Sequence, residues 1–333
     1  MTKRLAIIGA GSWGTALAIV AARVGHDVTL WSRDAAVVKS INEDRVNSRY
    51  LTFASIPEEV KATNEVAIAV DQASLVLLAA PSHAVRELLT AASPALDESA
   101  IIVSVSKGIE IETGKRISEI TKEVVGGTYA FVCLSGPSFA KEVVMGQPTA
   151  IVAASKDAAA ARTVQNDLSF ENLRIYTNND VVGTELGGSV KNVMAIAAGM
   201  TAGLGFGANS VAALITRGLA EITRLARREG AQMETLMGLA GLGDLVLTCT
   251  GSLSRNRFVG EELGKGRTLA EITAELNEVA EGINTARAVK KLADRAGLEM
   301  PITNEVNAVL YDGKPARDAV AELMSRPLRE EIS

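Results

Sequence analysis

One lysine near the middle of the chain lies in a segment that predicts a buried helix. Lys191 stands next to Asn192 in a run of small and apolar residues from Gly187 to Met200. A helix that is apolar on nearly every side is expected to be buried. Burial disfavours the charged form of a lysine and lowers its pKa, which suits it to act as a general acid or base near neutral pH. The alternative is a lysine at a helix end whose ammonium group reaches solvent.

The position of Lys191 in the chain favours the catalytic interpretation. The sequence before this helix is rich in strand patterns, and the sequence after it is almost purely helical. A lysine at such a junction is expected to face the cleft between two domains, where substrates usually bind. In the second half, Asp244 is a single carboxylate within an apolar, glycine-punctuated segment over residues 238–250. We expect Asp244 to pair with Lys191.

A glycine-rich segment near the N-terminus predicts a dinucleotide site. Gly9, Gly11 and Gly14 follow the apolar run at residues 5–8 and precede a helical pattern at residues 15–22. Between a strand and a helix, this spacing lets the backbone turn sharply and approach a pyrophosphate at the helix N-terminus. The alternative is a glycine-rich turn that binds no ligand.

The residues after the second predicted strand, at 27–31, bear on the choice of coenzyme. Asp34 is near the position at which a carboxylate usually holds the ribose hydroxyls of NAD, but Ser32 and Arg33 come first. A guanidinium group there can bind the 2′-phosphate of NADP through paired hydrogen bonds. We therefore expect NADP to be preferred, with NAD as the other candidate. The alternative is that Arg33 is a solvated loop charge.

Further strand patterns complete the first half of the chain. They lie at residues 74–80, 101–105, 130–134 and 149–153, with 173–176 as a possible addition, whereas residues 40–65 give no clear pattern. Ligands bind beyond the carboxyl ends of such strands, so Lys107 is well placed for an anionic or hydroxylated substrate. The pattern predicts an α/β protein with an N-terminal Rossmann-type doubly wound sheet, residues 1–186, followed by an all-α C-terminal domain, residues 187–333.

The second half holds two groups of charged residues. We expect the charges of a helix at about residues 210–230, which are Arg217, Glu221, Arg224, Arg227 and Arg228, to lie on a solvated face. The cluster at residues 254–257 opens another helix, where N–H groups and guanidinium groups together could bind a phosphate. Together with Asp244, Lys107 and Lys191, a guanidinium group of this cluster would give a cleft of three cations and one carboxylate. Residues 279–282 read as packing scaffold.

Bulk properties exclude several other classes of protein. A chain of 333 residues holds about two domains, and its net charge of −5 argues against binding to nucleic acid or to an anionic membrane. Cys133 and Cys249 have no neighbours that indicate a disulfide or a metal site, so we expect no metal. No signal peptide or membrane-spanning run is predicted. We expect a soluble, cytoplasmic protein that binds neither nucleic acid nor membrane.

Several motifs taken together resemble the family of bacterial NAD(P)-dependent glycerol-3-phosphate dehydrogenases. They lie at residues 9–16, 106–108, 135–142, 186–192, and 241–245 with 254–257. The resemblance covers nearly the whole chain, and the last two motifs are far more specific than the first. It implies hydride transfer between NAD(P)H and dihydroxyacetone phosphate, which gives sn-glycerol 3-phosphate for phospholipid synthesis. It also implies a homodimer.

The resemblance also implies roles for individual residues. Lys191 would accept the proton when glycerol 3-phosphate is oxidised, in a catalytic group with Asp244 and Lys107. The residues around the substrate would be Lys107, Gly136, Ser138, Lys191, Asp244, Ser254, Arg255 and Asn256. Besides Gly9, Gly11 and Gly14, the residues around the cofactor would be Ser12, Trp13, Arg33, Tyr50, Lys107, Ala140, Arg255, Val279 and Glu281.

Two other functions are compatible with the same fold. One is a different small-ketoacid reductase, such as a ketopantoate reductase, which would need a site for a carboxylate instead of a phosphate. The other is a non-catalytic module that senses NADP. A buried pair of Lys191 and Asp244 argues weakly against a sensor, because a sensor needs no proton transfer.

Overall fold

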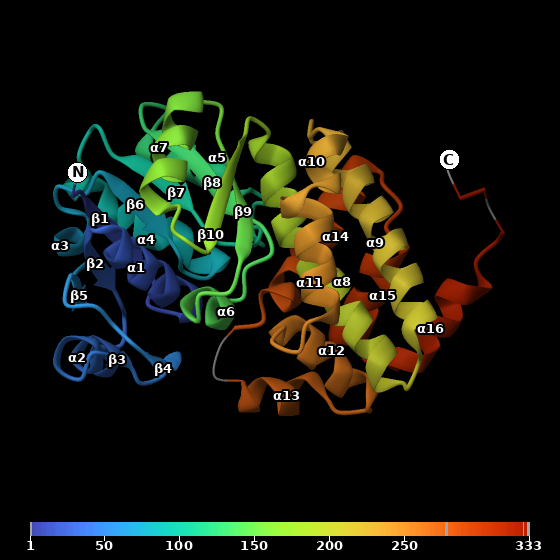
Figure 1. Cartoon of the computed structure of the whole chain (residues 1–333). Coiled ribbons are helices and arrows are strands. Elements are labelled where there is room, and N and C mark those ends of the chain that lie inside the picture. Colours follow the sequence, from blue (N-terminus) through green and yellow to red (C-terminus); the bar gives the residue numbers. More distant parts are fainter. Residues whose placement is uncertain (1, 277–278, 329, 332–333) are drawn as a thin grey trace.

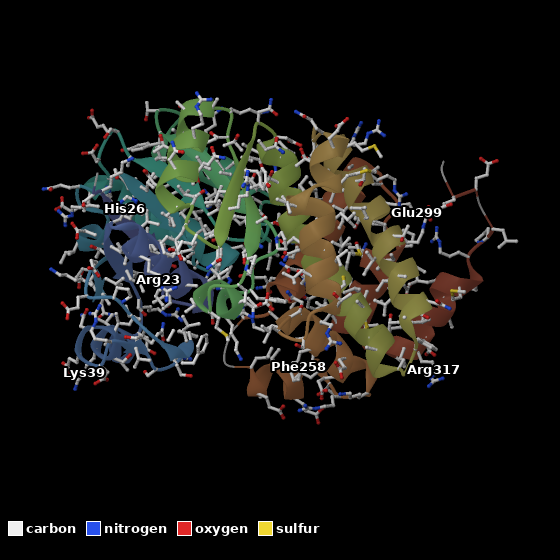
Figure 2. All side chains as sticks on the ribbon, in the orientation of Figure 1. Arg23, His26, Lys39, Phe258, Glu299 and Arg317 are labelled. Carbon is white, nitrogen blue, oxygen red and sulfur yellow. The ribbon has the colours of Figure 1, made fainter. Side chains whose placement is uncertain are left out.

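The protein has two parts, a sheet with helices on both faces and a bundle of helices (Figure 1). The computed structural model describes residues 2–276, 279–328 and 330–331. Charged side chains project all round the molecule: Figure 2 shows Lys39 and Arg317 at its opposite ends. None of the helices in the described part of the chain is long and apolar enough to cross a membrane.

The first part is built on an eight-stranded sheet with the order β10-β9-β8-β7-β6-β1-β2-β5. Its strands are β1 (Arg4–Ile8), β2 (Asp27–Trp31), β5 (Val60–Thr63), β6 (Leu75–Leu78), β7 (Ile101–Ser104), β8 (Ala130–Ser135), β9 (Thr149–Ala154) and β10 (Leu173–Asn178). Neighbouring strands run parallel except β8 and β9, which pair antiparallel. The predicted Rossmann-type sheet is confirmed, and the possible strand at residues 173–176 is present as β10.

The central strands are mostly apolar because helices cover both faces of the sheet. Leu5 and Ile7 of β1 pack with α1 (Ser12–Val24), α6 (Ala140–Val144) and α7 (Ala158–Leu168). Ala6 and Ile8 point to the other face, toward α3 (Val66–Val70), α4 (Val85–Ala92) and α5 (Ile117–Val125). Alternate residues of a strand face opposite sides, so a strand buried on both sides loses the alternation of apolar and polar residues.

The segment at residues 40–65, which gave no clear sequence pattern, forms the outer edge of the sheet part. It contains the end of α2 (Ala35–Glu43), a small antiparallel pair of β3 (Val46–Asn47) and β4 (Leu51–Ser55), and the edge strand β5. These strands are short and partly exposed, so neither a helical nor a strand period persists long enough to be recognised.

The second part is organised around α8 (Val181–Gly203), in which every residue from Gly183 to Thr201 is buried. The elements packed against it are α9 (Ala208–Arg228), α10 (Met233–Met237), the π-helical segment η3 (Leu239–Gly243), α11 (Asp244–Thr250), α12 (Arg255–Gly264), α14 (Glu281–Ala296) and α15 (Pro301–Tyr311). Further out, α13 (Leu269–Glu275) packs on α12, and α16 (Ala316–Ser325) packs on α15 and α12. The all-helical second part is therefore confirmed. The boundary between residues 186 and 187 stays a prediction, and it falls inside α8.

One expectation about α9 is wrong. Its four arginines are exposed, but Glu221 is only 3% exposed and does not lie on the solvated face. Its carboxylate accepts hydrogen bonds from the backbone N–H groups of Ile302 (2.7 Å) and Thr303 (3.3 Å), at the start of α15. The first N–H groups of a helix have no partners within it and attract negative charge. Glu221 therefore satisfies the buried end of a neighbouring helix.

Helices α8 and α12 pack with their backbones in direct contact. A Cβ atom added at Gly260 of α12 would lie 1.9 Å from the carbonyl oxygen of Ile196, and one added at Gly199 of α8 would lie 2.0 Å from that of Arg257. Gly203 and Gly264 continue this contact one turn further along. Since no side chain separates the two helices, their spacing is fixed, and with it the distance from Lys191 to the start of α12.

Candidate active site

Two lysines share one buried carboxylate where the two parts of the molecule meet. Asp244, the first residue of α11, is 1% exposed. One of its carboxylate oxygens lies 2.5 Å from Nζ of Lys191, and the other lies 2.7 Å from Nζ of Lys107. The predicted pairing of Lys191 with Asp244 is therefore present. Lys107 follows β7 and also donates to the carbonyl oxygen of Gly136 (3.0 Å).

The environment of Lys191 suits a group that gains and loses a proton. Burial of its side chain lowers the pKa to about 8, and nearby Lys107 lowers it as well, while Asp244 opposes both effects. Nζ also donates to Oγ1 of Thr248 (2.7 Å). An ammonium group has three N–H donors. Asp244 and Thr248 take two of them, and the third has no acceptor among the residues that the structure describes.

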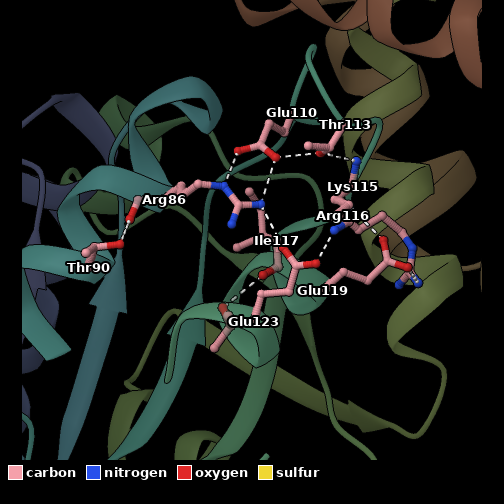
Figure 3. A network of polar contacts seen from close by, with 10 residues as sticks. Arg86, Thr90, Glu110, Thr113, Lys115, Arg116, Ile117, Glu119 and Glu123 are labelled. Carbon is pink, nitrogen blue, oxygen red and sulfur yellow. Dashed lines mark hydrogen bonds and ion pairs between the residues drawn. The ribbon is translucent and has the colours of Figure 1, made fainter. Parts of the chain in front are cut away.

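The loop that carries Lys107 is held by a network of ion pairs (Figure 3). Glu110 is 7% exposed and accepts from Nε (2.7 Å) and Nη2 (2.9 Å) of Arg86 on α4. Arg86 also contacts Glu123 of α5 (3.0 Å), so it lies between two carboxylates, as Figure 3 shows. Paired hydrogen bonds from a guanidinium group fix orientation as well as distance. This network anchors the loop three residues after Lys107.

A second contact ties α8 to the sheet part. Glu185 is 7% exposed and accepts from the backbone N–H (2.7 Å) and hydroxyl (2.6 Å) of Ser118, near the start of α5. Nη1 of Arg116 also donates to it, at 2.9 Å. Burial raises the pKa of Glu185, whereas Arg116 and Ser118 act to lower it. Lys191 lies six residues further along the same helix, so this contact helps to place it.

A chain of amide hydrogen bonds joins four elements beside the lysines. Asn192 donates to the carbonyl oxygen of Lys107 (3.2 Å), and Asn256 donates to Oδ1 of Asn192 (3.0 Å). Oδ1 of Asn256 accepts from the backbone N–H of Gly282, in α14, at 2.9 Å. The chain connects the Lys107 loop with α8, α12 and α14 and helps to hold these elements together beside the lysines.

The remaining residues expected around the substrate lie on two loops. Ser138 donates to the carbonyl oxygen of Gly136 (3.0 Å), which places both beside Lys107. Ser254 caps α12 by accepting from the N–H of Arg257 (3.2 Å), and exposed Arg255 is the first residue of that helix. The structure thus brings Lys107, Gly136, Ser138, Lys191 and Asp244 into one connected group. Asn256 joins it through Asn192, and the substrate contacts themselves stay predictions.

The three glycines of the N-terminal loop have different structural roles. Gly9 has φ of +124°, and a Cβ there would lie 2.7 Å from the backbone of Ala79. A Cβ at Gly14 would lie 1.9 Å from the carbonyl oxygen of Gly9, so these two glycines close the turn. A Cβ at Gly11, the N-cap of α1, would meet no atom within 4 Å. A ligand group could therefore approach the start of α1 at Gly11, and a helix N-terminus favours an anion such as a pyrophosphate.

The segment with Tyr50 packs directly on this loop. Asn47 donates to the carbonyl oxygen of Ala10 (2.9 Å), and Ser12 donates to that of Tyr50 (2.9 Å). Tyr50 is therefore close to the loop, although nothing in its surrounding sequence predicted this. Trp13 is partly buried in the first turn of α1. Its role toward the cofactor, like that of Tyr50, stays a prediction.

The other residues expected around the cofactor come from both parts of the molecule. Glu281, in α14, accepts from the hydroxyl (2.7 Å) and the backbone N–H (3.2 Å) of Ser82, which follows β6. Glu281 therefore links the helical part to the sheet, and its role toward the cofactor stays a prediction. Arg33 and Val279 are exposed, and Ala140 begins α6.

Sequence reasoning missed several residues of this site. Thr248 contacts Lys191 and donates to the carbonyl oxygen of Asp244 (2.6 Å). The signal was present, since Thr248 follows Asp244 by four residues, one turn of a helix. Ser82 and Glu185 act over long sequence separations, and no local pattern indicates them. Among the residues that the structure describes, no group of histidine, cysteine or acidic side chains could hold a metal ion.

A dinucleotide-type sheet, a glycine turn at the start of α1 and a buried lysine of lowered pKa are together typical of a nicotinamide-dependent dehydrogenase. Comparison with protein families gives the particular one. The family described as NAD-dependent glycerol-3-phosphate dehydrogenase matches with its N-terminal region over residues 4–161 and with its C-terminal region over residues 180–321. The chain belongs to this family.

Individual relatives agree over the full length. A glycerol-3-phosphate dehydrogenase [NAD(P)+] of Koribacter versatilis is 54% identical, with 99% of each chain covered. One of Citrifermentans bemidjiense is 50% identical, again with 99% of each chain covered. The crystal structure of glycerol-3-phosphate dehydrogenase from Coxiella burnetii is 40% identical and superposes with a TM-score of 0.95, covering 98% of this chain and 99% of that one.

Proposed function

We propose that the protein interconverts dihydroxyacetone phosphate and sn-glycerol 3-phosphate with NAD(P)H, and that the product supplies phospholipid synthesis. The observation that carries this proposal is the buried group of Lys191, Asp244 and Lys107, in a chain whose first part is a dinucleotide-type sheet. Membership of the family supports the choice of substrate. NADP is the preferred coenzyme in this proposal, with NAD as the other one used.

Lys191 and Lys107 have different roles toward the substrate. The bound nicotinamide supplies the hydride for reduction. Lys191, as an ammonium group, donates its third N–H to the C2 oxygen of the ketone and gives up that proton as negative charge develops. In the direction of oxidation, the neutral amine of Lys191 accepts the proton from the C2 hydroxyl. Asp244 holds Lys191 in place, and Lys107 adds a second positive charge that stabilises the oxyanion.

The phosphate end of the substrate would lie at the start of α12. Arg255 supplies a guanidinium group there, and the first turn of the helix supplies N–H groups. Since the α8–α12 contact fixes this end relative to Lys191, a bound phosphate would set the distance from the ketone to the proton donor. The helical part also limits access of water to the lysines, because α8 and α11 bury them.

The test is a comparison of ketone substrates with the purified protein. Oxidation of NADPH would be followed by absorbance with dihydroxyacetone phosphate and separately with ketopantoate, and NADH would be run alongside. Rapid oxidation only with the phosphorylated ketone is the expected result. Turnover of ketopantoate would favour the ketoacid reductase alternative. Tight NADPH binding without any turnover would favour the sensor alternative.

Assembly and location complete the proposal. We propose a homodimer in the cytoplasm, acting on small soluble metabolites. Light scattering of the purified protein should give twice the mass of one chain, which is 34.8 kDa. Fractionation of cells should place the activity with the soluble proteins. A monomer, or activity in the membrane fraction, would contradict these two statements.

A further inference from the structure

A carboxylate lies near the position where dinucleotide folds distinguish the two coenzymes. Asp34 follows β2 and is the N-cap of α2. In this fold, a carboxylate just beyond the second strand usually accepts hydrogen bonds from the ribose hydroxyls of NAD and repels the 2′-phosphate of NADP. An uncompensated Asp34 would therefore favour NAD, contrary to the preference proposed above.

The structure shows that Asp34 is not uncompensated. Oδ1 accepts from the backbone N–H of Ala36 (2.9 Å), and Oδ2 accepts from Nη1 of Arg49 (2.9 Å). The hydrogen bond from Ala36 is the larger cause and Arg49 a further cause of a lowered pKa of Asp34. Both carboxylate oxygens already have partners, and the negative charge is matched by a guanidinium group.

Arg49 is held in place by the same segment that packs on the glycine loop. Oδ1 of Asn47 accepts from the backbone N–H groups of Arg49 (3.3 Å) and Tyr50 (3.0 Å), while its Nδ2 donates to Ala10 and to Oγ1 of Thr15 (2.8 Å). Asn47 is fully buried. The backbone at Arg49 is thus fixed relative to the loop that would hold the pyrophosphate.

The guanidinium group of Arg49 keeps donors for a ligand. It lies over the ring of Tyr50, 5.2 Å from the ring centre, and its side chain is 53% exposed. Arginine has five N–H donors in a fixed planar fork that matches a phosphate. Arg33, one residue before Asp34, is also exposed. Of these two arginines, Arg49 is the one with a contact to the Asp34 carboxylate.

We propose that Arg49 determines coenzyme preference, by neutralising Asp34 and by offering its remaining donors to the 2′-phosphate of NADP. This inference rests on the proposed dinucleotide site but not on the identity of the ketone. It assigns the discrimination to the pair of Arg49 and Asp34, in place of Arg33 alone. Removal of Arg49 has two consequences: the phosphate loses a guanidinium partner, and Asp34 becomes free to repel it and to bind ribose hydroxyls.

The test measures binding of two adenine nucleotides by calorimetry, without any turnover. The full-length protein is titrated with 2′,5′-ADP, which carries the 2′-phosphate, and with 5′-AMP, which lacks it. Arg49→Gln should weaken 2′,5′-ADP by about 10- to 100-fold, the range for loss of a charged hydrogen-bonding partner, and leave 5′-AMP unchanged or slightly tighter. Lys39→Gln removes an exposed cation from α2 and should change neither affinity.

A double variant separates the two consequences. In Arg49→Gln/Asp34→Asn the repulsive carboxylate is also gone, and asparagine can still cap α2. We expect this variant to recover part of the lost affinity for 2′,5′-ADP. The inference is overturned if Arg49→Gln weakens both nucleotides equally, if it weakens neither, or if the wild-type protein binds both equally well. A wild-type protein that binds neither nucleotide would overturn the proposed dinucleotide site itself.

Discussion

Two aspartates, each at the start of a helix, contact cations at similar distances but in different surroundings. Asp244 begins α11, is 1% exposed and is shared by two lysines at 2.5 and 2.7 Å. Asp34 caps α2, has a side chain that is 34% exposed, and contacts one arginine at 2.9 Å. Burial, more than distance, decides what such a contact can do. Water and salt screen the exposed pair, whereas the buried group is barely screened.

The buried group at Asp244 and the exposed pair at Asp34 are therefore suited to different functions. In the buried group, desolvation competes with the charge of Asp244 and brings the pKa of Lys191 to about 8, where the lysine can exchange a proton. At the exposed pair a guanidinium group meets a carboxylate in contact with water, so the pair acts by attracting or repelling a charged ligand. The first arrangement suits proton transfer, and the second suits selection of a coenzyme.

The largest expected effect is the loss of Lys191. Lys191→Ala removes the proton donor, and turnover of dihydroxyacetone phosphate should fall by about two to four orders of magnitude. NADPH affinity should stay nearly constant, and Asp244 keeps Lys107 as its partner, so the chain should still fold. Steady-state kinetics and a binding titration measure the two quantities. Lys39→Ala, at the outer edge of the molecule in Figure 2, is the matched control and should leave both unchanged. Unchanged turnover of Lys191→Ala would refute its assigned role.

Asp244→Asn tests the buried ion pairs, because it leaves the ammonium groups of Lys107 and Lys191 without their shared carboxylate. Breaking a buried ion pair by removing one partner costs about 3–5 kcal/mol, so the free energy of unfolding in urea should drop by about that amount. The pKa of Lys191 should fall further, because the influence that raises it is gone. Asp34→Asn is the matched change at the exposed pair and should hardly move the urea midpoint. Equal losses in the two variants would contradict the role given to burial.

A smaller effect is expected from Gly260→Ala, which should disturb the site of Lys191 and Asp244 but not the coenzyme site at Asp34. The added methyl group would meet the carbonyl oxygen of Ile196, so α12 must shift away from α8. Overpacking of this kind costs about 1–3 kcal/mol of folding stability. KM for dihydroxyacetone phosphate should rise, while affinity for 2′,5′-ADP should not change. Gly127→Ala, where a Cβ meets no atom within 4 Å, should alter none of these quantities. A loss of nucleotide affinity in Gly260→Ala would show that the two sites are coupled.

The sequence alone predicted those parts of the site that depend on local pattern. Lys191 could be recognised because a single ammonium group stands in an apolar helix, and the glycine loop because it lies between a strand and a helix. Gly199 with Gly203, and Gly260 with Gly264, repeat at a four-residue spacing, a pattern that indicates close helix packing.

The rest depends on the way the fold brings distant residues together. By its spacing along α9, Glu221 is expected on the same helix face as the arginines. Only its contact with the start of α15 explains its burial. Arg49 lies in a segment whose strands are too short to show a period, and its partner Asp34 is separated from it by 15 residues. The link from Glu281 to Ser82 spans 199 residues. Composition and spacing carry no information about contacts of this kind.

The pH dependence of catalysis in both directions tests the role of Lys191 most directly. Reduction needs the ammonium form, so kcat/KM for dihydroxyacetone phosphate should be level below the pKa of about 8 and fall about tenfold per pH unit above it. Oxidation of glycerol 3-phosphate needs the neutral amine and should rise through the same pH to a plateau. Measurements should begin at about pH 7, where the substrate phosphate is already largely ionised. The predicted result is that the two pH profiles change slope in opposite directions at the same pH. Neither change should appear in the residual activity of Lys191→Ala. Two results would contradict the assignment of Lys191 as the group that transfers the proton: rates that do not change with pH, or pH profiles of Lys191→Ala with the same change of slope as the wild type.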